Sequence, residues 1–140
     1  MRSVLFLTIL LTITYIFSPS ISYACNSSES QCVSIDFSDG KTTKRFTSKV
    51  KGYQYIDFEF YASAGQILYV DLNDDIEGNK NTLDVLLFHR AFNHSVHLPS
   101  QMDTGFSMSL NGTYILRILQ MRTFARRGHT NAFVLTLTLN

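Results

Sequence analysis

Apolar residues alternate with polar ones in short runs along most of this chain, and that alternation limits the folds open to it. In the clearest run, at the C-terminus, large apolar residues occupy every second position: Phe133, Leu135, Leu137 and Leu139. A period of two is typical of a β-strand with one buried face, because successive side chains point to opposite sides. No segment after residue 24 sustains helical spacing over three turns, so we expect strands throughout.

Turn-forming residues separate these runs at short intervals. Residues 38–41 and 63–66 read "SDGK" and "SAGQ", and each contains a Ser and a Gly. Asn111-Gly112 is the strongest hairpin signal, so the runs 106–110 and 114–118 on either side are expected to pair with each other. Seven or eight short strands with such turns predict an all-β fold, an antiparallel β-sandwich. Its apolar core needs no cofactor.

The first 24 residues have the pattern of a secretory leader. Arg2 precedes an uncharged apolar run from Val4 to Phe17, and the small residues Ser22 and Ala24 stand three positions and one position before the expected cut. The run is also too short for an ordinary membrane span. The sequence therefore predicts an exported chain, cleaved after Ala24, whose residues 25–140 form one domain.

Cys25 and Cys32 are the only cysteines. In an oxidising compartment the simplest interpretation is a disulfide that closes a short loop near the mature N-terminus. Two unpaired thiols are a less favoured alternative there. A lipid anchor on Cys25 is another, although Ser22 and Tyr23 fit the usual lipidation pattern poorly.

Charge argues against nucleic acid as a partner. Loss of Arg2 with the leader reduces the 12 Lys and Arg residues to 11, equal to the 11 Asp and Glu residues. The distribution is uneven, because residues 104–140 contain Arg117, Arg122, Arg126 and Arg127 but neither Asp nor Glu. This locally cationic end favours a compact acidic target.

Metal and catalytic motifs receive little support. His89, His94 and His97 lie in "HRAFNHSVH", which matches no common zinc spacing and is expected to be an irregular loop. An acidic cluster lacks the ligand order of a calcium loop and is interpreted as a solvated turn: Asp74, Asp75 and Glu77. There is no nucleophile elbow and no phosphate-binding glycine loop. We therefore predict no metal, no cofactor, no catalytic residues and no enzymatic activity.

The segment "LQMRTFARRGHTNAF", residues 119–133, joins two strand-like runs and carries three arginines. A tight hairpin would need only two to five residues, so the extra length suggests a contact with another molecule. If 120–127 coils for a turn or two, Arg122 and Arg126 stand at i and i+4 on one face, where two guanidinium groups could grip carboxylates. The alternative is that they are ordinary solvated residues.

Two stretches resemble a known family. "KGYQYIDFEFYASAGQ" at 51–66 and "NGTYILRILQMRTFARR" at 111–127 are similar to the periplasmic inhibitors of goose-type lysozyme, small secreted β-sandwich proteins that bacteria use against animal muramidases. The likeness runs from about Val33 to the C-terminus. It implies that the partner is a goose-type lysozyme and that the loop enters the acidic substrate cleft of this enzyme. We further predict a monomer that neither binds nucleic acid nor spans a membrane.

By matching motif, the resemblance gives Arg122 and Arg126 the gripping role and Tyr53 a neighbouring aromatic contact. Phe124 and Arg127 are candidate auxiliary contacts, and the alternative for Phe124 is that it tucks under the loop. The chain departs from the family pattern in its cysteine pair, in its extended middle from Asn73 to Met102, and in Thr123-Phe124. A rival hypothesis is a secreted carbohydrate- or cell-wall-binding sandwich whose exposed tyrosines stack on sugars: Tyr53, Tyr55 and Tyr61.

Overall fold

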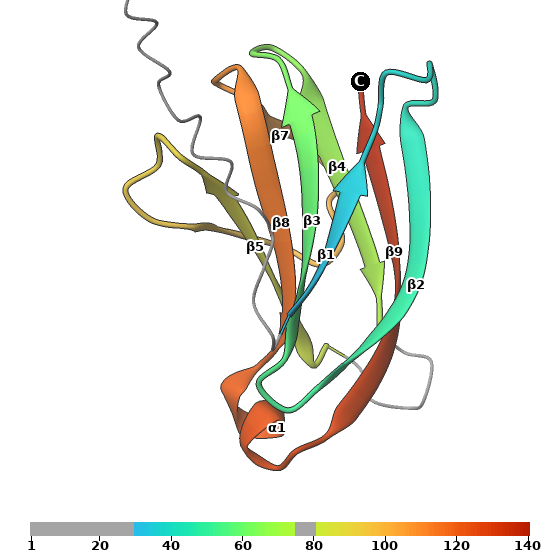
Figure 1. Ribbon diagram of the computed structural model, residues 1–140, viewed down its shortest axis with the longest axis vertical. Helices are drawn as coiled ribbons and strands as arrows, with labels where there is room; N and C mark the ends of the chain where they lie inside the picture. Colours follow the sequence, from blue (N-terminus) through green and yellow to red (C-terminus); the bar gives the residue numbers. More distant parts are fainter. Residues whose placement is uncertain (1–29, 75–80) are drawn as a thin grey trace, which may run out of the picture.

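Two β-sheets pack face to face in the computed structural model, which describes residues 30–74 and 81–140 (Figure 1). The first sheet contains, in spatial order, β1 (Ser30–Ile35), β3 (Tyr55–Ala62), β8 (Gly112–Gln120), β5 (Leu83–His89) and β6 (Val96–Leu98). The second contains β2 (Thr43–Lys51), β9 (Thr130–Leu139), β4 (Ile67–Asn73) and β7 (Phe106–Ser107). A short helix, α1 (Arg122–Arg126), lies at one end. The predicted leader, its cleavage point after Ala24 and Cys25 lie outside the described residues.

The prediction of an all-β sandwich is confirmed. The described part of the chain has nine strands rather than seven or eight, and the additional ones are short, since β6 has three residues and β7 has two. One pair departs from the antiparallel pattern, because β1 runs parallel to β3. The chain leaves the first sheet after β1, forms β2 in the other sheet and then returns as β3, so β1 and β3 point the same way.

The core lies between the two sheets and is built from the inward half of each alternation. The C-terminal run behaves as expected, because its four large apolar residues are all buried in β9 while their neighbours stay half exposed. The strand β3 likewise buries Ile56, Phe58 and Phe60. Burial of each such side chain contributes about 1.5–3 kcal/mol before conformational entropy is subtracted. The core therefore holds the ends of the strands in fixed positions.

The expected hairpin at Asn111-Gly112 is wrong. Residues 106–107 form β7 and pair with β4 in one sheet, whereas β8 lies between β3 and β5 in the other. The side chain of Asn111 accepts a hydrogen bond from the backbone N–H of Ala64 at 2.7 Å. The hydroxyl of buried Tyr114 donates to the carbonyl oxygen of Leu110 at 2.9 Å. Both bonds fix a crossing between sheets, which a local turn signal cannot distinguish from a hairpin.

The segment from His89 to His97 is irregular only in its middle, at residues 90–95, because its two ends belong to strands that form a hairpin. The strand β5 ends at His89, the chain turns, and β6 pairs back antiparallel with β5 through Leu87 and Val96. Only two alternating apolar residues, Val96 and Leu98, mark β6, which is too few for a pattern to be detected in the sequence.

Candidate protein-binding site

The loop that carries the three arginines crosses the end of the sandwich from one sheet to the other. It leaves β8 in the five-stranded sheet and enters β9 in the four-stranded sheet, with α1 in between (Figure 1). Packed sheets lie about 10 Å apart, so this connection requires more residues than a hairpin turn. The premise that its length exceeds what chain reversal needs is therefore wrong, and its length alone does not indicate a contact.

The condition under which Arg122 and Arg126 would share a face is met, since residues Arg122–Arg126 form α1. The backbone N–H groups of Phe124 and Ala125 donate to the carbonyl oxygen of Met121 at 2.9 and 3.0 Å, which forms the first turn. Gly128 ends the helix with a φ of +67°, a conformation that favours glycine. Ala125 is buried against the sandwich, and this contact orients the helix.

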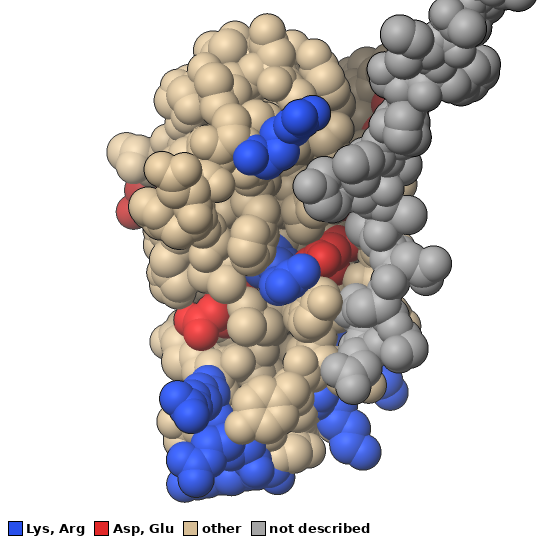
Figure 2. All heavy atoms as spheres, turned by 60° about the vertical axis from the view of Figure 1, so that its left-hand side comes forward, with Lys and Arg blue, Asp and Glu red and all other residues tan. Residues whose placement is uncertain are grey.

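Arg122 and Arg126 are both exposed on α1, one turn apart, and Arg127 follows directly. With Thr123 these three arginines line a hollow of about 350 Å³. Figure 2 shows Lys and Arg atoms gathered at the end of the molecule that carries α1. Within the described residues no carboxylate forms a salt bridge with any of the three. Their charges are therefore available to another molecule.

The turn between β2 and β3 lies against α1 and carries Tyr53. The N–H of Gly52 donates to the carbonyl oxygen of His129 at 2.9 Å, and a side chain at Gly52 would come within 3.8 Å of the carbonyl oxygen of Ala125. Gly52 also has a φ of +57°, so this close turn favours glycine. Tyr53 is 69% exposed. The structure thus brings the tyrosine turn and the arginine helix together at the same end.

Gln120, the last residue of β8, forms hydrogen bonds that link β2, β9 and the end of the arginine loop. Its amide nitrogen donates to the carbonyl oxygens of Val50 at 3.1 Å and His129 at 2.6 Å, and its oxygen accepts from Asn131 at 3.1 Å. Gln120 and Asn131 are 3% and 2% exposed. Our sequence analysis gave neither residue a role. The available signal is that both are polar yet occupy the inward positions of strands whose other inward residues are apolar.

The predicted auxiliary residues differ in their surroundings. Phe124 is half-buried, and its ring meets that of His129 edge-on with centroids 5.9 Å apart. It therefore packs within its own loop while part of it stays accessible. Arg127 is exposed and lines the same hollow as the other two arginines.

Arg117 does not belong to this cationic group, although it lies in the same basic stretch of sequence. Its guanidinium donates two hydrogen bonds to the carboxylate of Asp57, from Nε at 2.7 Å and from Nη2 at 2.8 Å. The same group lies 3.8 Å from the ring centre of Tyr55 and 5.0 Å from that of Phe88. Hydrogen bonding to Asp57 raises the pKa of Arg117 despite partial burial. Arg117 therefore interacts with residues on the outer face of its own sheet and does not join the arginines of α1.

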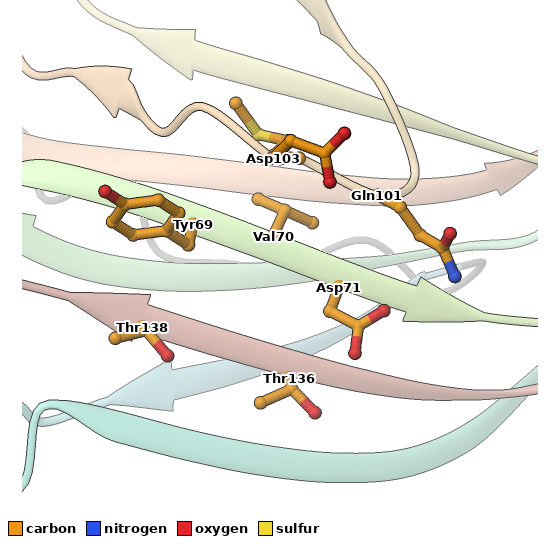
Figure 3. A pocket seen from close by; sticks show the side chains of 8 residues that line it. Tyr69, Val70, Asp71, Gln101, Asp103, Thr136 and Thr138 are labelled. Atoms are coloured by element: carbon orange, nitrogen blue, oxygen red, sulfur yellow. The ribbon is translucent and has the colours of Figure 1, made fainter.

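A second hollow lies on the four-stranded sheet and differs in character. Figure 3 shows Asp71 on β4, Thr136 on β9, and Gln101 and Asp103 on the segment that crosses β4. Carboxylates line this hollow, and no Lys or Arg is among the described residues around it. An acidic cleft of another protein would be repelled here, so the α1 end is the better candidate for such a partner.

The histidines and carboxylates considered above as metal ligands contact other protein groups. His89 packs against Tyr114 with ring centres 4.5 Å apart, and His97 reaches the carboxylate of Asp84 at 3.1 Å. In the part of the chain that the structure describes, no three potential ligands group together. Asp74 is buried rather than solvated. Its carboxylate accepts hydrogen bonds from the N–H groups of Asn81 and Thr82. Asp75 and Glu77 lie outside the described residues.

Known structures share this fold. The periplasmic inhibitor of g-type lysozyme from Salmonella Typhimurium, PliG, matches with a TM-score of 0.67 and 25% identity, covering 79% of this chain and 98% of its own. A mutant of the Escherichia coli PliG gives the same TM-score and identity over 79% and 99%. The Aeromonas hydrophila PliG gives 0.62 at 20% identity over 80% and 98%, a likeness of fold alone. No helix in residues 30–74 or 81–140 has the length and apolar character to cross a membrane.

Sequence comparison agrees with the structural one. No family model matches the chain. The inhibitor of g-type lysozyme from Escherichia coli strain K12 is 31% identical over 106 residues, which cover 72% of this chain and 75% of that protein. These relatives are inhibitors and not enzymes, which confirms the prediction of a protein without catalytic activity. The chain belongs to the family of inhibitors of g-type lysozyme.

Proposed function

We propose that this protein inhibits a g-type lysozyme by inserting α1 and the adjoining Tyr53 turn into the acidic substrate cleft of the enzyme. The observation that carries the proposal is the group of exposed arginines at one end of the sandwich, Arg122, Arg126 and Arg127, with no salt-bridge partner among the described residues. The relatives of this chain support the choice of target, since those proteins are inhibitors of g-type lysozyme.

Charge complementarity supports the same target. A glycosidase uses carboxylic groups to cleave its substrate, so its cleft carries acidic residues that it cannot replace without losing activity. Arginine forms paired hydrogen bonds with carboxylates, and Arg and Tyr are common hot spots of protein interfaces. Arg122 and Arg126 would grip the carboxylates and Tyr53 would pack beside them. Phe124 and Arg127 are proposed as auxiliary contacts.

Rigid support should strengthen this contact. The hydrogen bonds of Gln120, the buried side chain of Ala125 and the bond from Gly52 to His129 hold α1 against both sheets before any partner arrives. A loop that is ordered in advance loses less conformational entropy on binding, and more of the interaction energy then appears as affinity.

The remaining expectations complete the proposal. We infer that the chain is exported to the periplasm, that the leader is cut after Ala24, and that Cys25 and Cys32 form a disulfide near the mature N-terminus. The protein is proposed to act as a monomer.

Muramidase activity measured on cell-wall substrate, with and without the purified mature protein, tests the proposal. We expect loss of activity of a g-type lysozyme at a modest molar excess of the protein. Parallel assays with chicken-type and invertebrate-type lysozymes define the specificity. Undiminished g-type activity at a micromolar excess of correctly folded protein would refute the proposal.

The rival hypothesis, a single sugar-binding platform of three tyrosines, has less support. Tyr55 is half-buried and lies against the guanidinium of Arg117. Tyr53 is in the turn beside α1, whereas Tyr61 is near the far end of β3. Three tyrosines so arranged cannot stack on one short sugar chain. Binding to peptidoglycan without lysozyme present, lost on Tyr53→Ala, would favour this hypothesis instead.

A further inference from the structure

Two exposed lysines lie at the end of β2 that meets α1. Lys49 and Lys51 are exposed while Val50 between them is buried, so alternation places both lysines on the outer face of the four-stranded sheet. Lys51 pairs with Thr130, where β9 begins after the arginine loop, and the turn that follows Lys51 lies against α1. The two lysines therefore extend the cationic α1 end onto one outer face of the sandwich.

No carboxylate of the neighbouring elements offsets these lysines. Their partners on β9, Ala132 and Thr130, are uncharged. The strands β2 and β9 and the helix α1 contain neither Asp nor Glu. Within the described residues, neither Lys49 nor Lys51 forms a salt bridge. Their charges therefore add to those of the arginines on α1.

The other end of β2 differs, because its cations have carboxylates nearby. Arg45 and Asp71 both pair with Thr136, from opposite sides of β9, and are exposed on the same face. Lys44 forms a salt bridge with Asp39. The uncompensated positive charge of β2 is thus concentrated beside α1.

Lysines on an edge strand also have a structural use. The strand β2 is at the edge of its sheet, and charged side chains on an edge prevent it from pairing with edges of other proteins. A charge of either sign serves that purpose, whereas attraction of an acidic partner requires a positive charge. Reversal of the charge therefore distinguishes the two roles.

We propose that Lys49 and Lys51 steer the α1 end into the acidic cleft of the lysozyme during encounter. This inference rests on the proposed function, because the carboxylates of the cleft supply the negative field. A cleft lined by charges of one sign focuses its field and accelerates the approach of an oppositely charged partner. Charges beside a contact change the association rate and its salt dependence, whereas buried charged contacts change the dissociation rate. The lysines therefore set how fast the complex forms, and Arg122 and Arg126 set how long it lasts.

Stopped-flow measurement of association and dissociation rate constants with a g-type lysozyme tests the proposal. Lys49→Glu combined with Lys51→Glu keeps the edge charged but reverses the sign. At an ionic strength of about 0.1 M, where the Debye length is about 10 Å, association should slow by at least about fivefold. The dissociation rate constant should stay within about twofold of the natural value. At about 1 M salt the Debye length falls to about 3 Å, so the difference in association should disappear.

Lys41→Glu combined with Arg45→Glu is the matched control. Both residues are exposed, and the pair changes the net charge by the same amount at the far end of β2. Arg45 precedes Lys51 by six residues of strand, or about 20 Å, so screening at about 0.1 M should limit the control to less than about a twofold effect. Lys49→Gln combined with Lys51→Gln removes the charges without reversing them and should give an intermediate rate. Thermal melting verifies that each variant is folded.

Association of the Lys49→Glu, Lys51→Glu variant at the natural rate would overturn the inference and leave the lysines as protection of the edge. Equal slowing by the control pair would attribute the effect to net charge and would also overturn it. Faster dissociation with unchanged association would show direct contacts instead of steering. Failure of the natural protein to bind any g-type lysozyme would refute the proposed function itself, an outcome distinct from natural binding that the lysine substitutions leave unchanged.

Discussion

Gln120 donates a hydrogen bond from Nε2 to the carbonyl oxygen of His129 over 2.6 Å, which links the end of β8 to the residue just before β9. The same side chain bonds to Val50 and Asn131, so one buried amide joins both sheets beneath α1. Gln120 touches no proposed partner. We regard it as a positioning residue for the arginine helix.

Gln120→Met should weaken both stability and inhibition. The substitution keeps the side-chain length but leaves buried groups of Val50, His129 and Asn131 without a partner, at a cost of about 2–4 kcal/mol in the free energy of unfolding. Chemical denaturation measures that cost. The inhibition constant of the folded protein should rise because α1 is held less firmly. Gln101→Met, at an exposed glutamine on the four-stranded sheet, is the matched control and should change neither quantity.

Arg122→Ala combined with Arg126→Ala should weaken inhibition without unfolding the protein. Truncation of one partner in a buried charged contact costs about 2–5 kcal/mol, so the inhibition constant should rise by at least about thirtyfold. The free energy of unfolding should change by less than about 0.5 kcal/mol, because both side chains are exposed. Titration of lysozyme activity and thermal melting give the two quantities.

Arg45→Ala is the control for loss of charge. Arg45 is exposed on β2, six residues before the end of that strand at Lys51, where the chain turns towards α1. The Arg45→Ala substitution removes one positive charge, and the variant should retain full inhibition. If the double arginine variant inhibited as well as the natural sequence, the interface would have to lie on another face.

Tyr53→Ala should reduce inhibition while the melting temperature stays unchanged. At 69% exposure, the side chain contributes little to folding, whereas an aromatic anchor at an interface is often worth about 2 kcal/mol or more. Calorimetric melting and an inhibition titration of the same sample distinguish the two effects. Lower stability with unchanged inhibition would identify Tyr53 as a packing residue instead.

Arg117→Met should destabilise the protein strongly but should not affect inhibition by the molecules that remain folded. It leaves the 8% exposed Asp57 as an unpaired carboxylate, which costs about 3–5 kcal/mol. Adding Asp57→Leu to Arg117→Met removes that charge and should recover part of the loss. Equal destabilisation in single and double variants, measured by denaturation, would argue against the pairing.

The pH dependence of this pair follows from the raised pKa of Arg117. A raised folded-state pKa means that the contribution is complete below the ordinary pKa of arginine and is lost only as the pH rises through the raised value. Stability contributed by Arg117 should therefore persist throughout mildly alkaline conditions.

Local pattern was sufficient to predict most of the strands and to raise the possibility of a helical turn at the arginines. The alternation in 133–139 and the i, i+4 spacing of Arg122 and Arg126 depend on neighbours in sequence, and both behave as expected. The role of Gln120 could have been suspected from its inward position in β8, where a polar side chain must find buried partners. Those partners come from distant parts of the chain, so the sequence does not identify them.

The local sequence pattern could not show which of the two sheets each strand belongs to. Asn111-Gly112 has the composition of a hairpin turn, yet the strands on either side belong to different sheets. The same holds for the arginine loop, whose length is explained by a crossing between β8 and β9. Which strands become neighbours depends on the packing of the whole core.

The crossing has a consequence for the design of mimics. The helix α1 has five residues, far fewer than the dozen or more that an isolated peptide needs to be helical in water. Its shape is imposed by two anchors, one in each sheet, and not by its own sequence. A linear synthetic fragment spanning the arginines would be mostly unstructured, and a useful antagonist would need a macrocyclic bridge as wide as the sandwich.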